Sequence, residues 1–122
     1  MSDYKKRLGA YGENLAGAFL IRRGYKIVDK NFRTNFGEID LIAFKGDELL
    51  FVEVKTRTAS NFGYPELAVD WRKIRHLIKA AKIYLSLKNY DNFWRLDIIS
   101  VEIDKQNKTA KFRWINDVGN AP

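Results

Sequence analysis

Two neighbouring apolar segments of this chain each carry a pair of charged residues. Glu38 and Asp40 lie in the first segment, and Glu53 and Lys55 lie in the second. Side chains alternate between the two faces of a strand, so residues two positions apart project from the same face. Charged groups on a face that packs into a core are costly to bury, which indicates a chemical role.

Residues 45–48, between the two segments, have the composition of a hairpin turn. Gly46 and Asp47 fit a two-residue type II′ turn, which favours glycine at its first central position. The register that follows from this turn places Asp40 directly opposite Glu53. The same register places Glu38 opposite Lys55.

Two opposed carboxylates can share one divalent cation. Mg²⁺ and Mn²⁺ prefer oxygen ligands and usually take one or two protein carboxylates, leaving other positions to water and substrate phosphate. Asp40 and Glu53 fit this role, and the carbonyl of Val54 could add a third oxygen. Lys55 would lie beside the cation, where it could orient the attacking water or neutralise charge on a phosphorane-like transition state.

The competing interpretation is a salt-bridged cluster in which Lys55 pairs with Glu38 and the other two acids meet lysines or arginines elsewhere. Cross-strand charge pairs of this kind contribute about 0.2–1 kcal/mol. This cluster leaves Asp40 and Glu53 as like charges in direct opposition, which is destabilising unless a cation or a proton intervenes. The pattern therefore favours a metal site.

Hydrophobic periodicity predicts the elements that position these residues. Helices are expected over 3–23 and roughly 66–88, the second with a proper N-terminal cap only at Asp70. The expected strands cover 25–33, 38–44, 48–57, 93–103 and 109–115. The order is α-β-β-β-α-β-β, an α/β fold with one mixed sheet flanked by helices.

The chain length of 122 residues suits a single domain covering 1–122. The nearly continuous apolar run 49–52 predicts that its strand is central. Residues 109–115 are expected to form an edge strand, and the tail 116–122 is expected to fray.

The first predicted helix carries a line of small residues, Gly9, Gly12 and Ala16, beside its apolar stripe. Glycine lowers helix stability, so this line predicts close approach to another part of the backbone. Glu13 borders the line, and on the sequence pattern alone a solvated glutamate on the helix flank is its simplest interpretation.

The net charge of +7 suits a polyanionic partner, nucleic acid being the commonest, although a basic protein without such a partner fits equally well. The second helix carries a basic ridge with no acidic residue between Trp71 and Asn89 to balance it. The ridge is either a solvated face or a phosphate-binding surface. Its lysines and arginines are Arg72, Lys73, Arg75, Lys79 and Lys82.

Several classes of function are excluded or disfavoured by composition. There are no cysteines, so no disulfide framework or thiolate metal site can form. The single histidine, His76, lies within the basic ridge and is interpreted as a surface residue. No unbroken apolar stretch follows the basic N-terminus, so we expect a cytoplasmic protein with no membrane role.

Over about residues 9 to 103 the sequence resembles the YraN-like family of the PD-(D/E)xK nuclease superfamily, distantly similar to archaeal Holliday junction resolvases. The resemblance rests on Glu13 within Tyr-Gly-Glu-Asn-Leu-Ala, on Gly-Glu-Ile-Asp at 37–40, and on Phe-Val-Glu-Val-Lys-Thr-Arg at 51–57. Further matching stretches are 24–25, 31–33, 62–65, 80–81 with 84–85, and 95–99. Ile39 stands where the name-giving proline would be.

This resemblance implies a restriction-endonuclease-like fold and Mg²⁺- or Mn²⁺-dependent phosphodiester cleavage. It makes Asp40 and Glu53 metal ligands, Lys55 the catalytic lysine, and Glu13 a helix-borne acid that reaches the site. Resolvase-like relatives also suggest a homodimer, because a four-way junction has two-fold symmetry.

Three functions follow from these observations. The first is an endonuclease acting on DNA, including branched or structured substrates, with Arg33, Arg57 and the basic ridge holding phosphates. The second is a nucleic-acid-binding module on a nuclease fold with little or no catalysis. The third is a protein-interaction domain, which predicts no salt-dependent affinity for DNA or RNA.

Overall fold

The computed structural model describes residues 3–60, 63–64 and 67–120. A five-stranded sheet has the order β1-β2-β3-β4-β5. β3 and β4 pair in parallel, and the other neighbouring strands pair antiparallel. The predicted mixed sheet and the order α-β-β-β-α-β-β are confirmed, with β3 central and β5 at an edge. The elements are α1 (Asp3–Arg22), β1 (Lys26–Thr34), β2 (Gly37–Lys45), β3 (Glu48–Thr58), α2 (Trp71–Leu87), β4 (Phe93–Asp104), β5 (Thr109–Ile115) and the 3₁₀ helix η1 (Val118–Asn120).

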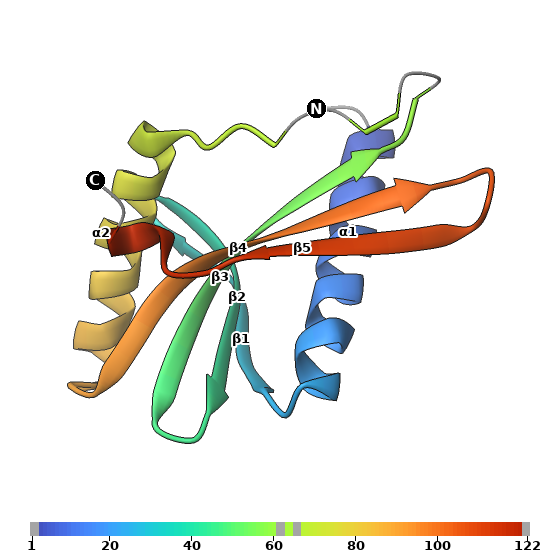
Figure 1. The fold of residues 1–122 in the computed structure, drawn as a ribbon. Helices are drawn as coiled ribbons and strands as arrows, with labels where there is room; N and C mark the ends of the chain where they lie inside the picture. The colour runs from blue at the N-terminus through green and yellow to red at the C-terminus, as the bar shows by residue number, and fades with distance from the viewer. Residues whose placement is uncertain (1–2, 61–62, 65–66, 121–122) are drawn as a thin grey trace.

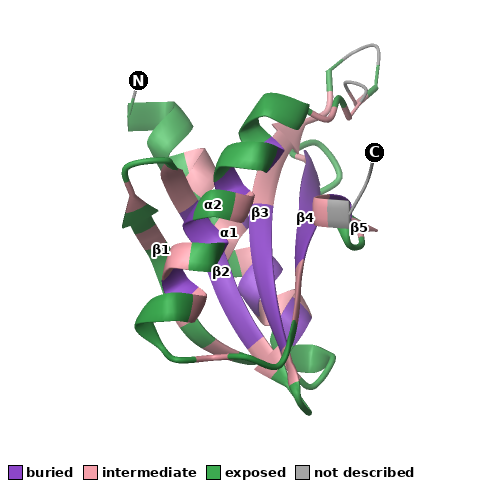
Figure 2. Cartoon of the chain, turned by 90° about the vertical axis from the view of Figure 1, so that its left-hand side faces the viewer, coloured by how far each residue is buried: buried purple, intermediate pink, exposed green. Residues whose placement is uncertain are grey.

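The two helices lie on opposite sides of a strongly twisted sheet (Figure 1). Leu50 and Val52 of β3 pack on the α1 side, whereas Phe51 packs on the α2 side, as strand alternation requires. The middle of β3 and most of β4 are buried (Figure 2). Parallel strands need a long crossover connection, and α2 supplies it between β3 and β4.

The close approach predicted for the first helix occurs at Gly12. A Cβ atom added to Gly12 would lie 1.8 Å from Oγ1 of Thr56 on β3, so only glycine fits there. Ala16 is also fully buried, whereas a Cβ on Gly9 would meet nothing within 4 Å. The contact at Gly12 holds the next residue, Glu13, close to the sheet.

The second helix begins later than predicted. Asp70 has an extended backbone and its side chain accepts hydrogen bonds from the backbone N–H groups of Arg72 and Lys73, at 3.1 and 3.2 Å. This is an N-cap, and it confirms Asp70 in that role. The expected start near residue 66 is wrong for the described residues 67–70, which are not helical, and residues 65–66 lie outside the described part of the chain.

The end of the chain is packed rather than frayed as far as it is described. Val118 is 4% exposed and lies in the core on the α2 side. The backbone N–H of Asp117 donates to the carboxylate of Asp97, at 2.7 Å. Apolar burial and this hydrogen bond hold the tail, against the expectation for 116–122, of which residues 121–122 lie outside the described part.

Asp97 is a fully buried acid on β4. Besides Asp117, its carboxylate accepts from Nε of Arg95 at 3.0 and 3.1 Å and from Nε1 of Trp114 at 2.7 Å. Arg95 also bonds Glu48 at 2.7 Å, so the arginine charge is shared between two acids. The cluster ties β3, β4, β5 and the tail together.

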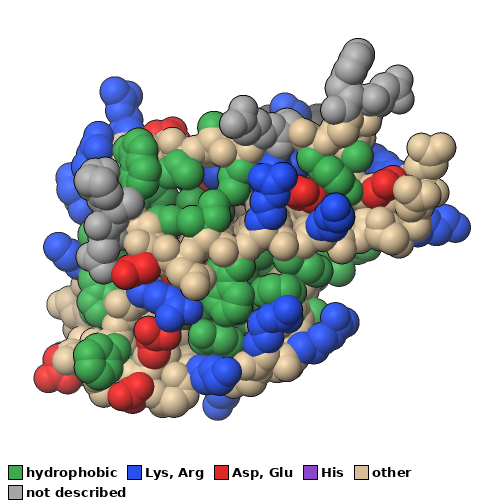
Figure 3. Space-filling view, viewed as in Figure 1, with side chains coloured by type: hydrophobic (Ala, Val, Ile, Leu, Met, Phe, Trp, Pro, Cys, Tyr) green, Lys and Arg blue, Asp and Glu red, His purple; other side chains and the backbone are tan. Residues whose placement is uncertain are grey.

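Basic side chains are prominent on the surface. In Figure 3 they gather at the upper left, over the start of α2, and also follow β5. Among the described residues, neither helix has the length and apolar character needed to cross a membrane.

Candidate active site

The predicted β2–β3 hairpin register is confirmed from the turn outward. Lys45 pairs with Glu48, and the pairing continues to Leu41 and Val52. Gly46 has a φ of 65°, the left-handed value that the first position of a type II′ turn needs. Beyond Leu41 and Val52 no further residue pairs join the two described strands. The hairpin therefore opens at the next residue of β2, which is Asp40.

Asp40 lies at the position where β2 separates from β3. Its Oδ2 accepts a hydrogen bond from the backbone N–H of Val54 at 2.8 Å, in place of a backbone carbonyl of β2. The paired residues keep the predicted register but end at Leu41 and Val52, one position before the predicted opposition of Asp40 and Glu53. The two carboxyl groups nevertheless meet, since a hydrogen bond between Asp40 and Glu53 contributes to the raised pKa of Asp40.

Glu38 contacts a residue of β1 rather than one of β3. It pairs with Arg33 in the β1–β2 ladder, and Nε of Arg33 lies 3.9 Å from Oε2 of Glu38. The prediction that Glu38 lies opposite Lys55 is therefore wrong, because β2 has separated from β3 at that level. The side chain of Arg33 is 82% exposed, which leaves its guanidinium open to solvent.

The Asp40–Glu53 pair holds an excess of negative charge in a buried position. Glu53 is 4% exposed. Burial, followed by the hydrogen bond and the charge of Glu53, raises the pKa of Asp40 from 3.8 to about 9. Without an added cation, the pair therefore keeps a proton on Asp40 at neutral pH.

Lys73 of α2, rather than Lys55, contacts the acid pair. The Lys73 ammonium forms an ion pair with Oε2 of Glu53. Burial acts to lower the pKa of Lys73, but the hydrogen bond and charge of Glu53 outweigh it and raise that pKa. Nζ of Lys55 instead donates to the carbonyl oxygen of Ala68 at 3.3 Å, in the segment that leads into α2.

Glu13 approaches the pair from the α1 side. Its Oε1 accepts a hydrogen bond from Nδ2 of Asn31 at 3.0 Å, and its negative charge contributes to the raised pKa of Asp40. Asn31 has a left-handed φ of 51°, which asparagine tolerates better than most residues. The sequence pattern assigned no role to Asn31, which lies near the end of the strand predicted over 25–33.

The donor set fits a divalent cation. Two carboxyl groups supply hard oxygens, and Oε2 of Glu53 is a buried atom whose described partner is the Lys73 ammonium. No group of three or more acidic, histidine or cysteine side chains is placed to hold a metal among the described residues. Mg²⁺ commonly uses only one or two protein carboxylates, so Asp40 and Glu53 are sufficient as candidate ligands.

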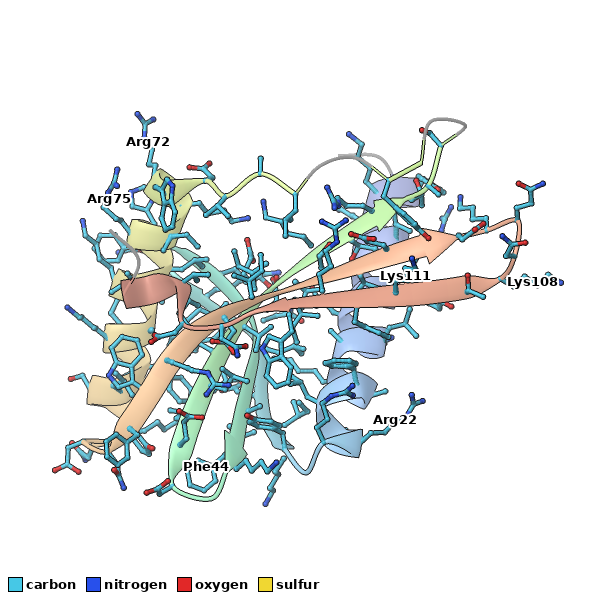
Figure 4. All side chains as sticks on the ribbon, viewed as in Figure 1. Arg22, Phe44, Arg72, Arg75, Lys108 and Lys111 are labelled. Atoms are coloured by element: carbon cyan, nitrogen blue, oxygen red, sulfur yellow. The ribbon has the colours of Figure 1, made fainter. Side chains whose placement is uncertain are left out.

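The residues expected to bind nucleic acid divide into two groups. The side chain of Arg57 is 13% exposed and its Nη2 bonds Oε1 of Glu102 at 3.0 Å, an oxygen shared with Arg113 at 2.7 Å. Arg57 is thus engaged inside the protein, which disfavours the predicted contact of its side chain with phosphate. Arg72 and Arg75 instead point away from the body of the protein at the start of α2 (Figure 4).

Two cavities flank Glu38, which lines both of them. One, of about 320 Å³, lies toward α2 and is lined by Phe36, Arg72, Lys73 and other residues. The second, of about 480 Å³, lies toward α1 and includes Glu13 and Arg33 with the basic residues of the first helical turn, Lys5 and Lys6. Cationic side chains therefore line the cavities on both sides of Glu38.

A mixed sheet between two helices, with buried acids where β2 leaves β3, defines a PD-(D/E)xK nuclease-like class of protein. The model of "Uncharacterised protein family UPF0102" matches residues 12–101. The chain belongs to this UPF0102, or YraN-like, family.

Bacterial relatives match over most of their length. A UPF0102 protein of Caldanaerobacter subterraneus subsp. tengcongensis is 42% identical over 96% of this chain and 95% of its own. One from Clostridium perfringens is 39% identical over 96% of this chain and 97% of its own. One from Geobacter metallireducens is 45% identical over 87% of this chain and 88% of its own.

Among solved structures, Pyrococcus furiosus SfsA in complex with Ca²⁺ is similar at 16% identity and a TM-score of 0.44. The match covers 92% of this chain and 63% of the SfsA chain.

Proposed function

We propose that this protein is a Mg²⁺- or Mn²⁺-dependent nuclease that hydrolyses phosphodiester bonds in DNA, including branched or structured DNA. The observation that carries the proposal is the Asp40–Glu53 pair, two carboxyl groups in contact, in which Glu53 is 4% exposed and the pKa of Asp40 is raised to about 9. Acids with strongly perturbed pKa values are a frequent mark of a functional site.

Asp40 and Glu53 are the residues that would hold the cation. A bound divalent cation would stabilise charge on the phosphoryl oxygens and lower the pKa of a coordinated water. The N–H of Val54 holds Oδ2 of Asp40 in place. Glu13, held by Asn31, adds negative charge on the α1 side.

In hydrolysis, the oxygen of a water molecule bonds to phosphorus and one P–O ester bond breaks. The electron pair of that bond goes to the leaving oxygen, which takes up a proton, and the other product is a phosphate monoester. Lys55 and Lys73 lie on the α2 side of the acid pair, where an ammonium can neutralise charge on the phosphate or orient the water. We assign Lys55 to the phosphate, because Lys73 is already paired with Glu53.

A cleavage assay tests this function. Linear duplex, single-stranded and four-way-junction DNA would each be incubated with Mg²⁺ or Mn²⁺. We expect cleavage by the wild type and a loss of at least about 100-fold in Asp40→Asn and in Lys55→Ala, with DNA binding kept. Asp47→Asn, in the exposed hairpin turn, is the matched control. Equal cleavage by wild type and Asp40→Asn would contradict the proposed role of the acid pair.

A second candidate is a nucleic-acid-binding module with little or no catalysis. The ion pair between Lys73 and Glu53 favours it, because an internal cation already compensates the buried acid. This candidate predicts salt-dependent binding in the same assays, with no cleavage of any of the three substrates with either metal.

A further inference from the structure

Phe36 is an exposed aromatic residue in the turn between β1 and β2. Its relative exposure is 43%, so part of its ring is open to solvent. The turn is short and leads directly into β2, whose fourth residue is Asp40. An aromatic ring is therefore presented next to the candidate active site.

The turn that carries Phe36 is held by its own hydrogen bonds. The backbone N–H of Phe36 donates to Oγ1 of Thr34 at 3.0 Å, and that hydroxyl donates to the carbonyl of Gly37 at 3.0 Å. Nζ of Lys79 lies 5.2 Å from the centre of the ring, within cation–π distance. A ring fixed in this way loses little conformational freedom when a ligand stacks on it.

The surroundings of Phe36 favour a nucleic acid strand. Phe36 lines the cavity of about 320 Å³ together with Arg72, Lys73 and His76. Lys73 also contacts Glu53, so one residue of the cavity lining connects it to the acid pair. A flat ring beside cationic side chains is the combination with which proteins bind unpaired nucleotides: bases stack on the ring and phosphates contact the cations.

We propose that Phe36 stacks on an unpaired nucleobase next to the phosphate that lies at the acid pair. The substrate class is then single-stranded nucleic acid or the unpaired strand of a branched one, rather than uninterrupted duplex. This inference rests on the proposed function for the position of the phosphate, whereas the stacking itself requires no catalysis.

Binding measured without divalent metal separates the stacking from cleavage. Fluorescence anisotropy in EDTA would compare an oligothymidylate, a duplex of equal length and a forked DNA. We expect Phe36→Ala to weaken binding of the oligothymidylate and the fork by about 5- to 100-fold and to change duplex binding less than twofold. Phe36→Trp, which keeps a larger stacking surface, should bind the single strand as well as wild type or better.

Phe93→Ala is the matched control, since Phe93 is 66% exposed at the start of β4 and does not line this cavity. Oligonucleotides with 2-aminopurine at successive positions would locate the stacked base. One position should lose its fluorescence change in Phe36→Ala and keep it in Phe93→Ala.

Equal effects of Phe36→Ala on single-stranded and duplex binding, or no effect on either, would overturn the stacking. So would Phe36→Trp binding as weakly as Phe36→Ala. If Phe36-dependent binding is found but no substrate is cleaved, the nuclease proposal fails and the stacking stands. If duplex is cleaved and Phe36→Ala cleaves every substrate as wild type does, the stacking fails alone.

Discussion

Two buried acidic clusters in this protein are built in opposite ways. Asp97 is fully buried and accepts hydrogen bonds from Arg95, Trp114 and Asp117. Glu53 is almost as buried, yet the donors described around the Asp40–Glu53 pair are one backbone N–H and one lysine.

The number of donors that meet each carboxylate distinguishes the structural cluster of Asp97 from the proposed functional pair of Asp40 and Glu53. A buried carboxylate whose oxygens all meet donors can stay ionised and tie elements together. A pair of carboxylates short of donors must share a proton or take up a cation, and burial raises the pKa of Asp40 accordingly. We therefore expect the two clusters to respond in opposite directions when they are altered.

The largest expected effect on stability is at the Asp97 cluster, in which hydrogen-bond donors surround the carboxylate. Asp97→Ala leaves the Arg95 guanidinium and two N–H donors without their acceptor, so the free energy of unfolding should fall by about 3–5 kcal/mol. Urea unfolding measures this loss. If Asp97→Ala does not fold, Trp114→Phe can be measured in its place. This variant removes one donor, and its free energy of unfolding should fall by about 1–2 kcal/mol. An Asp97→Ala chain as stable as the exposed-site control Asp91→Ala would contradict the structural role.

Removing the charge of Asp40 in the Asp40–Glu53 pair should change stability in the opposite direction. An acid whose pKa is raised on folding contributes its full stability below its unfolded pKa of 3.8, and this contribution is lost as pH rises toward 9. Asp40→Asn cannot ionise, and its side chain can still accept from Val54 and donate to Glu53. The variant should match wild type near pH 4 and exceed it by about 1–3 kcal/mol above pH 8.

Unfolding curves measured across this pH range test the comparison. Asp29→Asn, on the neighbouring strand β1, serves as the control. If Asp40→Asn is less stable than wild type at every pH, the pair is a completed structural cluster like that of Asp97.

A smaller effect is expected at Lys73, whose side chain is 53% exposed. Lys73→Ala should lower the free energy of unfolding by only about 0.5–1 kcal/mol, because water screens an exposed ammonium. It should also strengthen Mg²⁺ binding severalfold, since the lysine competes with the metal for Glu53. Lys82→Ala on the same helix should change neither quantity, and Mg²⁺ titration by calorimetry measures the difference.

The local features of the site could be predicted from the sequence. Gly46 defined the turn, the turn defined the register as far as Leu41 and Val52, and Asp70 defined the helix cap. These features depend on residues close together in the chain, where backbone geometry leaves few alternatives. The small residue Gly12 likewise predicted a close approach.

The contacts between elements could not be predicted in the same way. Counting pairs along a hairpin cannot show that β2 leaves β3 at Asp40, because a side chain then replaces a backbone acceptor. The choice of Lys73 over Lys55 depends on where α2 begins and how it lies on the sheet. The burial of Val118 likewise depends on packing between distant segments.

Cation binding at Asp40 and Glu53 is tested most directly by calorimetric titration of Mn²⁺ into the wild type, Asp40→Asn and Trp114→Phe. Binding requires Asp40 to lose its proton, so affinity should rise with pH up to about 9 and one proton should be released per cation at neutral pH. We predict binding by wild type and Trp114→Phe and at least about tenfold weaker binding by Asp40→Asn. Equal binding by all three proteins, without proton release, would contradict the assignment of this pair as the metal site.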